Sequence, residues 1–195
     1  MASKFKKSGF TLLELLIALA IVGIIGVLIA GIFFAHSRLF SNQQTSVGVS
    51  EQNALALDEI TGQIRQSQTV VTTCSSCGSY ATGSNTLVLQ AWPVDSQGSP
   101  IEPTASNYDY IIYTRDTSQN KLLKITFADV TSNRSSGTRT VIANVLDLVF
   151  DDGSGSFPAD LGQVTQVRVK ITTQATTTNK THVITQEAKA VLRNK

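Results

Sequence analysis

The hydrophobic pattern begins with a long apolar run near the amino terminus. Residues 15–35 form 21 consecutive positions without a charged side chain. At a rise of about 1.5 Å per residue, a helix of this length measures roughly 31 Å and can cross the hydrocarbon core of a bilayer. Gly23, Gly26 and Gly31 lie inside the run, where they either loosen the helix or allow close helix packing. The pattern predicts a membrane-spanning helix.

A second pattern follows directly and predicts that the helix continues. No proline occurs in residues 37–68, and apolar side chains recur at steps of three and four residues. These are Ala54, Leu57, Ile60 and Ile64. Such spacing places them on one face of an amphipathic helix. We therefore expect one helix over residues 10–66, with its second half packed on a globular domain.

The remainder of the chain predicts short antiparallel strands separated by polar turns. Residues 164–173 alternate clearly, with apolar side chains at odd positions such as Val167 and Val169, and Arg168 and Lys170 between them. The residues at 116–120 are typical of a hairpin connection. Strands packed on one apolar helix face predict the α+β class. The expected strands are 70–73, 87–92, 108–115, 121–128, 140–150, 164–173 and 182–192.

The two cysteines, Cys74 and Cys77, leave more than one interpretation open. No βαβ pattern surrounds the pair, as a thioredoxin-like redox centre would require. A zinc site would need two further ligands, and the only histidines are His36 and His182, far apart in sequence. We expect a local disulfide that shapes a loop without being needed for the fold, provided that this region lies outside the cytoplasm. Free thiols and a reactive pair are the alternatives.

Little in the sequence indicates catalysis, a cofactor or a nucleic-acid partner. No nucleophile and base are recognisable together, so we predict no enzymatic activity and no cofactor. Asp151, Asp152 and Asp160 could bind calcium, but their spacing differs from an EF-hand loop and a solvated turn is the simpler interpretation. The formal charge is only +2, without a clustered basic patch of the kind that binds nucleic acid.

The residues before the apolar run decide how the anchor is interpreted. Lys4, Lys6 and Lys7 form a positive flank of the kind that remains cytoplasmic. A secretory signal would have a small-residue cleavage site after the apolar region, whereas the only such triplet nearby, 18–20, lies in its middle. A plain signal anchor would leave the costly acid Glu14, at the edge of the run, without a purpose.

The sequence from Gly9 to Glu14, Gly-Phe-Thr-Leu-Leu-Glu, resembles the class III leader junction of type IV pilins and type II secretion pseudopilins. The resemblance implies that a prepilin peptidase cuts after Gly9 and methylates the new amino group of Phe10. It also implies that Glu14 acts in filament assembly. Removal of the leader takes away three lysines and changes the formal charge from +2 to −1.

The resemblance further implies the organisation and location of the protein. It divides the chain into a cleaved leader (1–9), a transmembrane or filament-core helix (10–36), its amphipathic continuation (37–66) and a β-rich head (67–195). We expect a pilin-like subunit in the cytoplasmic membrane, with its head outside, that later joins a pilus or pseudopilus. The expected partners are the peptidase, the lipid bilayer, other pilin subunits and a membrane-embedded assembly machinery.

The carboxyl-terminal strands refine this expectation, and one alternative remains. Residues 145–151, 164–171 and 190–194 are similar to the tail of W-type minor pilins and J-type minor pseudopilins. The sequence does not distinguish a retractile pilus from a secretion pseudopilus or a DNA-uptake filament. The alternative is a membrane-anchored, adhesin-like binding module that never polymerises.

Overall fold

The computed structural model describes residues 11–104, 107–177 and 180–192. By its internal contacts the chain forms two units, Met1–Gln44 and Thr45–Lys195. One helix, α1 (Leu12–Gln66), supplies the described part of the first unit and continues into the second. Its last residue is the one that the sequence predicted.

In the second unit, α1 buries one face against the head. The buried positions include Leu57, Ile60 and Ile64, three of the four residues of the predicted apolar stripe. Ala54, the fourth, is exposed, and Ala56 is buried in its place. The contact face therefore passes through Asn53, Ala56, Leu57, Ile60, Thr61 and Ile64. Polar Asn53 belongs to this face because its amide oxygen accepts a hydrogen bond from Thr173 Oγ1 at 3.0 Å.

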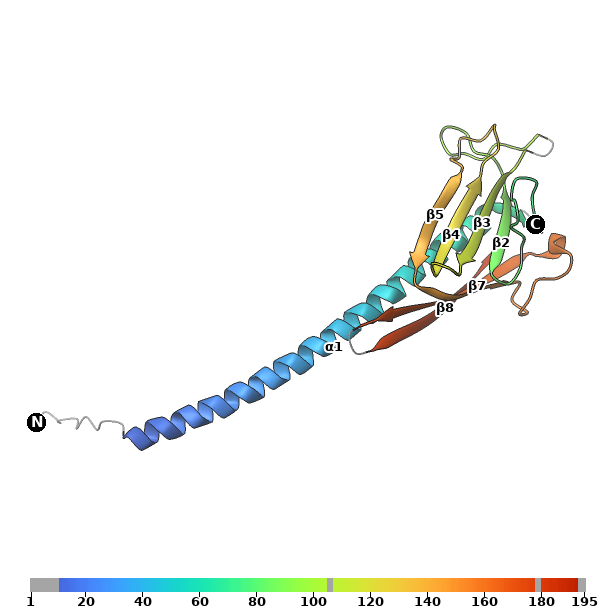
Figure 1. The fold of residues 1–195 in the computed structure, drawn as a ribbon. Helices are drawn as coiled ribbons and strands as arrows, with labels where there is room; N and C mark the ends of the chain where they lie inside the picture. Colours follow the sequence, from blue (N-terminus) through green and yellow to red (C-terminus); the bar gives the residue numbers. More distant parts are fainter. Residues whose placement is uncertain (1–10, 105–106, 178–179, 193–195) are drawn as a thin grey trace, which may run out of the picture. The chain divides into compact units, whose positions relative to one another are not determined.

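The first sheet has five antiparallel strands in sequence order, of which Figure 1 labels the second to the fifth. The strand predicted at 70–73 is displaced toward the helix, because the chain passes from α1 into a strand at Ser67 and leaves it after Val70. The predicted connection at 116–120 joins two adjacent strands, and Asp116 pairs with Lys121 across it. The strands are β1 (Ser67–Val70), β2 (Thr86–Ala91), β3 (Asp109–Asp116), β4 (Lys121–Phe127) and β5 (Gly137–Ala143).

The second sheet has three antiparallel strands, β6 (Val145–Asp151), β7 (Gln166–Thr176) and β8 (Thr181–Val191), with a short 3₁₀ helix, η1 (Leu161–Gln163), before β7. The single strand predicted at 140–150 is wrong. Asn144 has φ 59° and separates β5 in one sheet from β6 in the other. A left-handed residue ends the extended run, and asparagine is one of the few side chains that tolerate that conformation.

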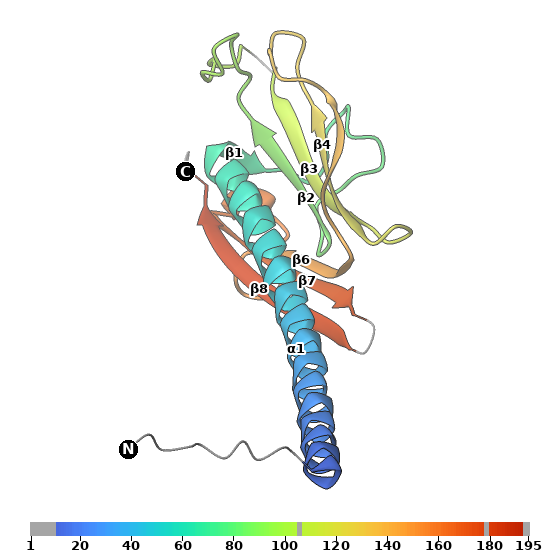
Figure 2. The ribbon, with the colours of Figure 1, turned by 90° about the vertical axis from the view of Figure 1, so that its left-hand side faces the viewer.

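Two apolar clusters lie on opposite faces of the five-stranded sheet. The larger joins the buried face of α1 to both sheets, including Leu87, Tyr113 and Val169. Figure 2 shows the second half of α1 lying along the strands. The smaller cluster contains a cross-strand row, Val88, Ile112 and Ile125. Both faces of the central strands are therefore covered, and the predicted α+β, pilin-like architecture of an apolar helix on antiparallel sheets is confirmed.

Candidate functional site: the amino-terminal helix and its head

The first part of α1 is apolar on every side and is not covered by the other residues that the structure describes. Its large apolar side chains, from Leu12 to Phe40, are exposed. Within α1 an 18-residue window reaches a mean hydropathy of 3.0, and α1 is long and apolar enough to cross a membrane. A helix that is hydrophobic all round is stable only inside lipid or among other apolar helices. This segment therefore needs a bilayer or neighbouring subunits.

Glu14 has a local structural role at the start of this helix. Its carboxylate accepts hydrogen bonds from the Thr11 backbone amide at 3.1 Å and from Thr11 Oγ1 at 3.0 Å. The Glu14 amide lies 3.3 Å from Thr11 Oγ1, to which it donates in return. This reciprocal pair is a capping box, in which two otherwise unpaired amides of the first helical turn are satisfied. The sequence analysis assigned no capping role to Thr11, although the Thr-x-x-Glu spacing of residues 11–14 is typical of a capping box.

The predicted cleavage and methylation residues, Gly9 and Phe10, lie outside the described residues. The helix glycines, in contrast, can be examined. The helix continues through Gly23, Gly26 and Gly31, and a Cβ added at any of them would have no atom within 4 Å outside the local helix backbone. Contacts with the described part of the chain therefore do not require glycine at these positions. Close packing against another helix remains a reason for them.

Cys74 and Cys77 are joined by a disulfide with a Cα–Cα distance of 5.1 Å. The Cys77 amide donates to the Cys74 carbonyl at 3.2 Å, which closes a tight turn between β1 and β2. Cys77 is fully buried on the row formed by Val88, Ile112 and Ile125. The disulfide loop thus covers the face of the five-stranded sheet that is opposite α1. The predicted disulfide is present, and whether the fold needs this loop stays a prediction for stability measurements to decide.

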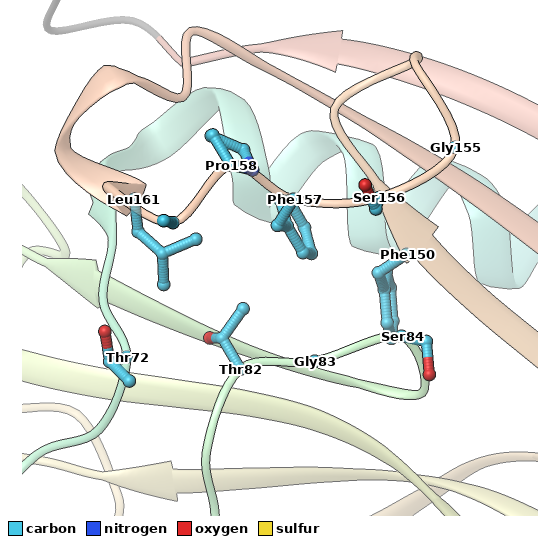
Figure 3. A pocket seen from close by; sticks show the side chains of 11 residues that line it. Thr72, Thr82, Gly83, Ser84, Phe150, Gly155, Ser156, Phe157, Pro158 and Leu161 are labelled. Atoms are coloured by element: carbon cyan, nitrogen blue, oxygen red, sulfur yellow. The ribbon is translucent and has the colours of Figure 1, made fainter.

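A pocket of about 290 Å³ lies between the β1–β2 segment and the loop that follows β6. In Figure 3, Phe157 and Leu161 on one wall face Thr82 on the other. The lining consists of apolar side chains, hydroxyl groups and glycine backbone, without a titratable group. This pocket can accommodate an apolar group but offers no acid or base for catalysis.

The three aspartates considered for calcium are occupied by other partners. Arg168 Nε donates to both carboxylate oxygens of Asp151, and Arg168 Nη2 donates to Asp151 Oδ2 at 2.7 Å. Asp152 accepts from Ser154, and Asp160 caps η1 through the Gly162 amide. Across residues 11–104, 107–177 and 180–192, no group of three His, Cys, Asp or Glu side chains is placed to hold a metal ion. The acids therefore stabilise turns and one ion pair.

Another charged cluster was not apparent from the sequence, because its members come from separate elements. Glu59 on α1 lies 3.4 Å from Lys124 Nζ on β4 and also contacts Arg139 on β5. The Tyr113 hydroxyl donates to the same carboxylate at 3.3 Å. Burial, reinforced by the Glu59 charge and hydrogen bond, raises the pKa of Tyr113 far above its ordinary value. The cluster connects the helix to three strands.

These features define an α+β protein whose amino-terminal helix is suited to membrane anchoring and whose β-rich head packs on the helix continuation. Residues 4–32 match the family described as "Prokaryotic N-terminal methylation motif". The match supports the superfamily of type IV pilins and pseudopilins and a precursor that prepilin peptidase processes. It covers residues 4–9 of the leader and most of the apolar run, including Gly9, Phe10 and Glu14. No curated protein matches the chain.

The motif and the helix together suggest membrane anchoring with an extracellular head. The family defined by the motif is structural rather than enzymatic, and it implies processing by the peptidase and assembly with other pilin subunits. The W-type or J-type subclass is not part of that match.

Proposed function

We propose that this protein is a minor pilin or pseudopilin, a structural subunit of a type IV pilus or type II secretion pseudopilus. The observation that carries the proposal is the coincidence of the methylation motif at residues 4–32 with an uncovered, uninterrupted apolar helix. A static anchor needs the helix but has no use for a processed amino terminus. A filament subunit needs both.

In this proposal the helix exchanges one apolar environment for another. Before assembly its side chains contact acyl chains, and afterwards they contact the helices of neighbouring subunits. Phe10 supplies the methylated amino group after cleavage at Gly9, and Glu14 supplies the carboxylate that pairs with the amino group of a neighbour. A lone buried carboxylate would cost several kcal/mol in a filament core, so such pairing would select the correct register.

The subclass is proposed from the carboxyl-terminal strands. The order β6, β7 and β8, with residues 190–192 at the end of the described chain, is in keeping with the similarity to W-type minor pilins and J-type minor pseudopilins. The destination would then be the cell-surface pilus or the periplasmic pseudopilus, reached from the cytoplasmic membrane through the assembly machinery.

Fractionation of the native host tests the assembly role. We expect the chain in the membrane fraction and also, in smaller amounts, in filaments sheared from the cell or isolated from the periplasm. A Gly9→Val variant provides the matched control, because it keeps the anchor and removes the cleavage junction. It should remain in the membrane only. A wild-type chain that is likewise absent from filaments would contradict the proposal and favour the adhesin-like membrane module.

A further inference from the structure

A polar pocket of about 300 Å³ lies between the end of α1 and the five-stranded sheet. Gln63 from α1, Lys124 from β4 and Arg139 from β5 line it, together with Arg134 from the segment before β5. The strands concerned are labelled β3, β4 and β5 in Figure 1. This pocket is separate from the membrane segment and from the pocket of Figure 3.

Three cations line the pocket, and among the described residues two carboxylates form ion pairs with them. Glu59 contacts both Lys124 and Arg139. The second carboxylate, Asp109, is fully buried and lies 3.3 Å from Arg134 Nε. Asp109 also accepts hydrogen bonds from Ser132 Oγ and the Asp129 amide. One positive charge is therefore left without a matching anion.

Two hydrogen-bond donors of the lining residues are enclosed without a partner. These are Arg134 Nη1 and Gln63 Nε2, which have no acceptor among the described residues. Buried donors are nearly always satisfied, and an unsatisfied one costs free energy that an acceptor would recover. The guanidinium of Arg134 has a fork of donors, of which Nε is used by Asp109. Because neither atom is exposed, an oxyanion in the pocket could accept from them only after these side chains turn toward it.

Burial is the main influence on the pKa of Lys124, and Glu59 has a larger effect on it than either arginine. Burial lowers the pKa of its ammonium, and the nearby Arg139 and Arg134 lower it further, while Glu59 acts in the opposite direction. An added anion would relieve the repulsion among the three cations.

We propose that this pocket binds an oxyanion carried on a small polyol, as in an acidic sugar with a carboxylate or phosphate group. Its volume is at the lower end of the range for organic ligands, about 300–1,000 Å³, and larger than a bare ion requires. Hydroxyl groups of Ser135, Ser136 and Thr138 line the same space. Ser136 Oγ accepts from the Ala128 amide at 2.9 Å, which leaves its own proton available for a ligand.

A nucleic-acid ligand fits these observations less well. Nucleic-acid backbones bind along a row of cations that neutralises several phosphates. Here Lys124, Arg134 and Arg139 line one pocket. The inference does not depend on filament assembly, because it concerns contacts within the unit Thr45–Lys195 alone.

Saturation-transfer NMR on the full chain in detergent micelles tests the inference. The probes are glucuronate, glucose 6-phosphate, glucose, inorganic phosphate and a short DNA duplex. We expect glucuronate or glucose 6-phosphate to bind at least about tenfold more tightly than glucose, because a charge-assisted hydrogen bond is gained. Binding of glucuronate would show that the pocket accepts a carboxylate, and binding of glucose 6-phosphate would show that it accepts a phosphate.

Two variants at exposed positions locate the site. Arg139→Gln should weaken binding about tenfold or more, because it removes a cation from the rim. Thr138→Glu should abolish binding, because it places a negative charge beside the ligand. Lys170→Gln, on β7 in the other sheet, makes the same charge change as Arg139→Gln and should bind normally. Thermal melting confirms that each variant is folded.

Three results would overturn the inference. The first is an absence of binding by both acidic sugars, and the second is unchanged binding by Arg139→Gln. The third is tighter binding of the DNA duplex than of either sugar, which would indicate a nucleic-acid surface. Inorganic phosphate that binds as tightly as glucose 6-phosphate would overturn the polyol part of the proposal.

Discussion

Thr11 and Glu14 hold each other at the first turn of α1, with the Thr11 amide and hydroxyl 3.1 and 3.0 Å from the Glu14 carboxylate. The same carboxylate is proposed to act in assembly. A carboxylate at this position can therefore stabilise the helix start within one chain and select a neighbour between chains. The two roles predict different outcomes for different substitutions.

The charge of Glu14 can be separated from its hydrogen bonding. Glu14→Gln keeps the capping box, in which glutamine replaces glutamate, but cannot pair as an anion with the amino group of Phe10. We expect Glu14→Gln and Glu14→Leu to enter the membrane and be cleaved at Gly9, and both to be depleted from filaments. Immunoblots of membrane and filament fractions measure the ratio.

Thr11→Ala is the matched control for that comparison. It removes the hydroxyl from the capping box, at a typical cost of about 1 kcal/mol, and leaves the Glu14 charge in place. It should therefore enter filaments more efficiently than Glu14→Gln. Normal incorporation of Glu14→Gln together with depletion of Thr11→Ala would show that helix capping, rather than charge, is what assembly requires.

The disulfide loop provides a stability prediction. Replacing Cys74 and Cys77 with serine should destabilise the head, because a hydroxyl at the fully buried position 77 would cost about 1–3 kcal/mol if unsatisfied. Replacing both with alanine removes the cross-link without burying a polar group. Since the enclosed loop is very small, the loss of its entropic effect should be modest.

Urea unfolding of the full chain in detergent, monitored by near-ultraviolet circular dichroism, compares the two variants. We expect the serine pair to unfold at a lower urea concentration than the alanine pair, and both at a lower concentration than the wild type. Equal midpoints for the serine pair and the wild type would mean that the loop does not close a second core.

The raised pKa of Tyr113 predicts that the folded protein loses stability at alkaline pH. Burial and the neighbouring Glu59 raise its pKa in the folded state, whereas the unfolded chain should titrate near the ordinary value of about 10. The folded state therefore retains a proton that the unfolded state releases. The stabilisation is complete below pH about 10 and is lost progressively as the pH rises above that value.

Tyr113→Phe isolates this effect, because phenylalanine has no ionisable hydroxyl. The free energy of unfolding should fall less steeply above pH 10 in this variant than in the wild type, although the variant loses the hydrogen bond to Glu59. Identical slopes in the two proteins would exclude Tyr113 as the group responsible.

The parts of the fold that depend on local periodicity could be predicted from the sequence. The end of α1 and the buried side of β7 both follow from spacing within a few residues. The break at Asn144 could not, because the mostly apolar run over residues 141–150 hides a change of sheet that only tertiary pairing reveals. One of the four residues predicted for the buried face of α1 was wrong: Ala54 is exposed, and Ala56, which is equally apolar, is buried.

Some of the candidate sites could likewise be predicted from local sequence, and others could not. Gly9, Phe10 and Glu14 belong to a short contiguous motif and could be recognised without a structure. The burial of Cys77 depends on strands β2, β3 and β4, and the cationic pocket depends on α1, β4 and β5. Such sites arise from residues far apart in the chain, which no local pattern brings together.

The amino terminus of the mature protein tests the central claim most directly. The full chain would be produced with a prepilin peptidase, purified from membranes and measured by intact-mass and amino-terminal fragment analysis. We expect a chain that begins at Phe10 and carries one added methyl group, whereas Gly9→Val should retain the lysine-rich leader. A wild-type chain that also retains the leader in the presence of active peptidase would contradict the assignment as a pilin-like precursor.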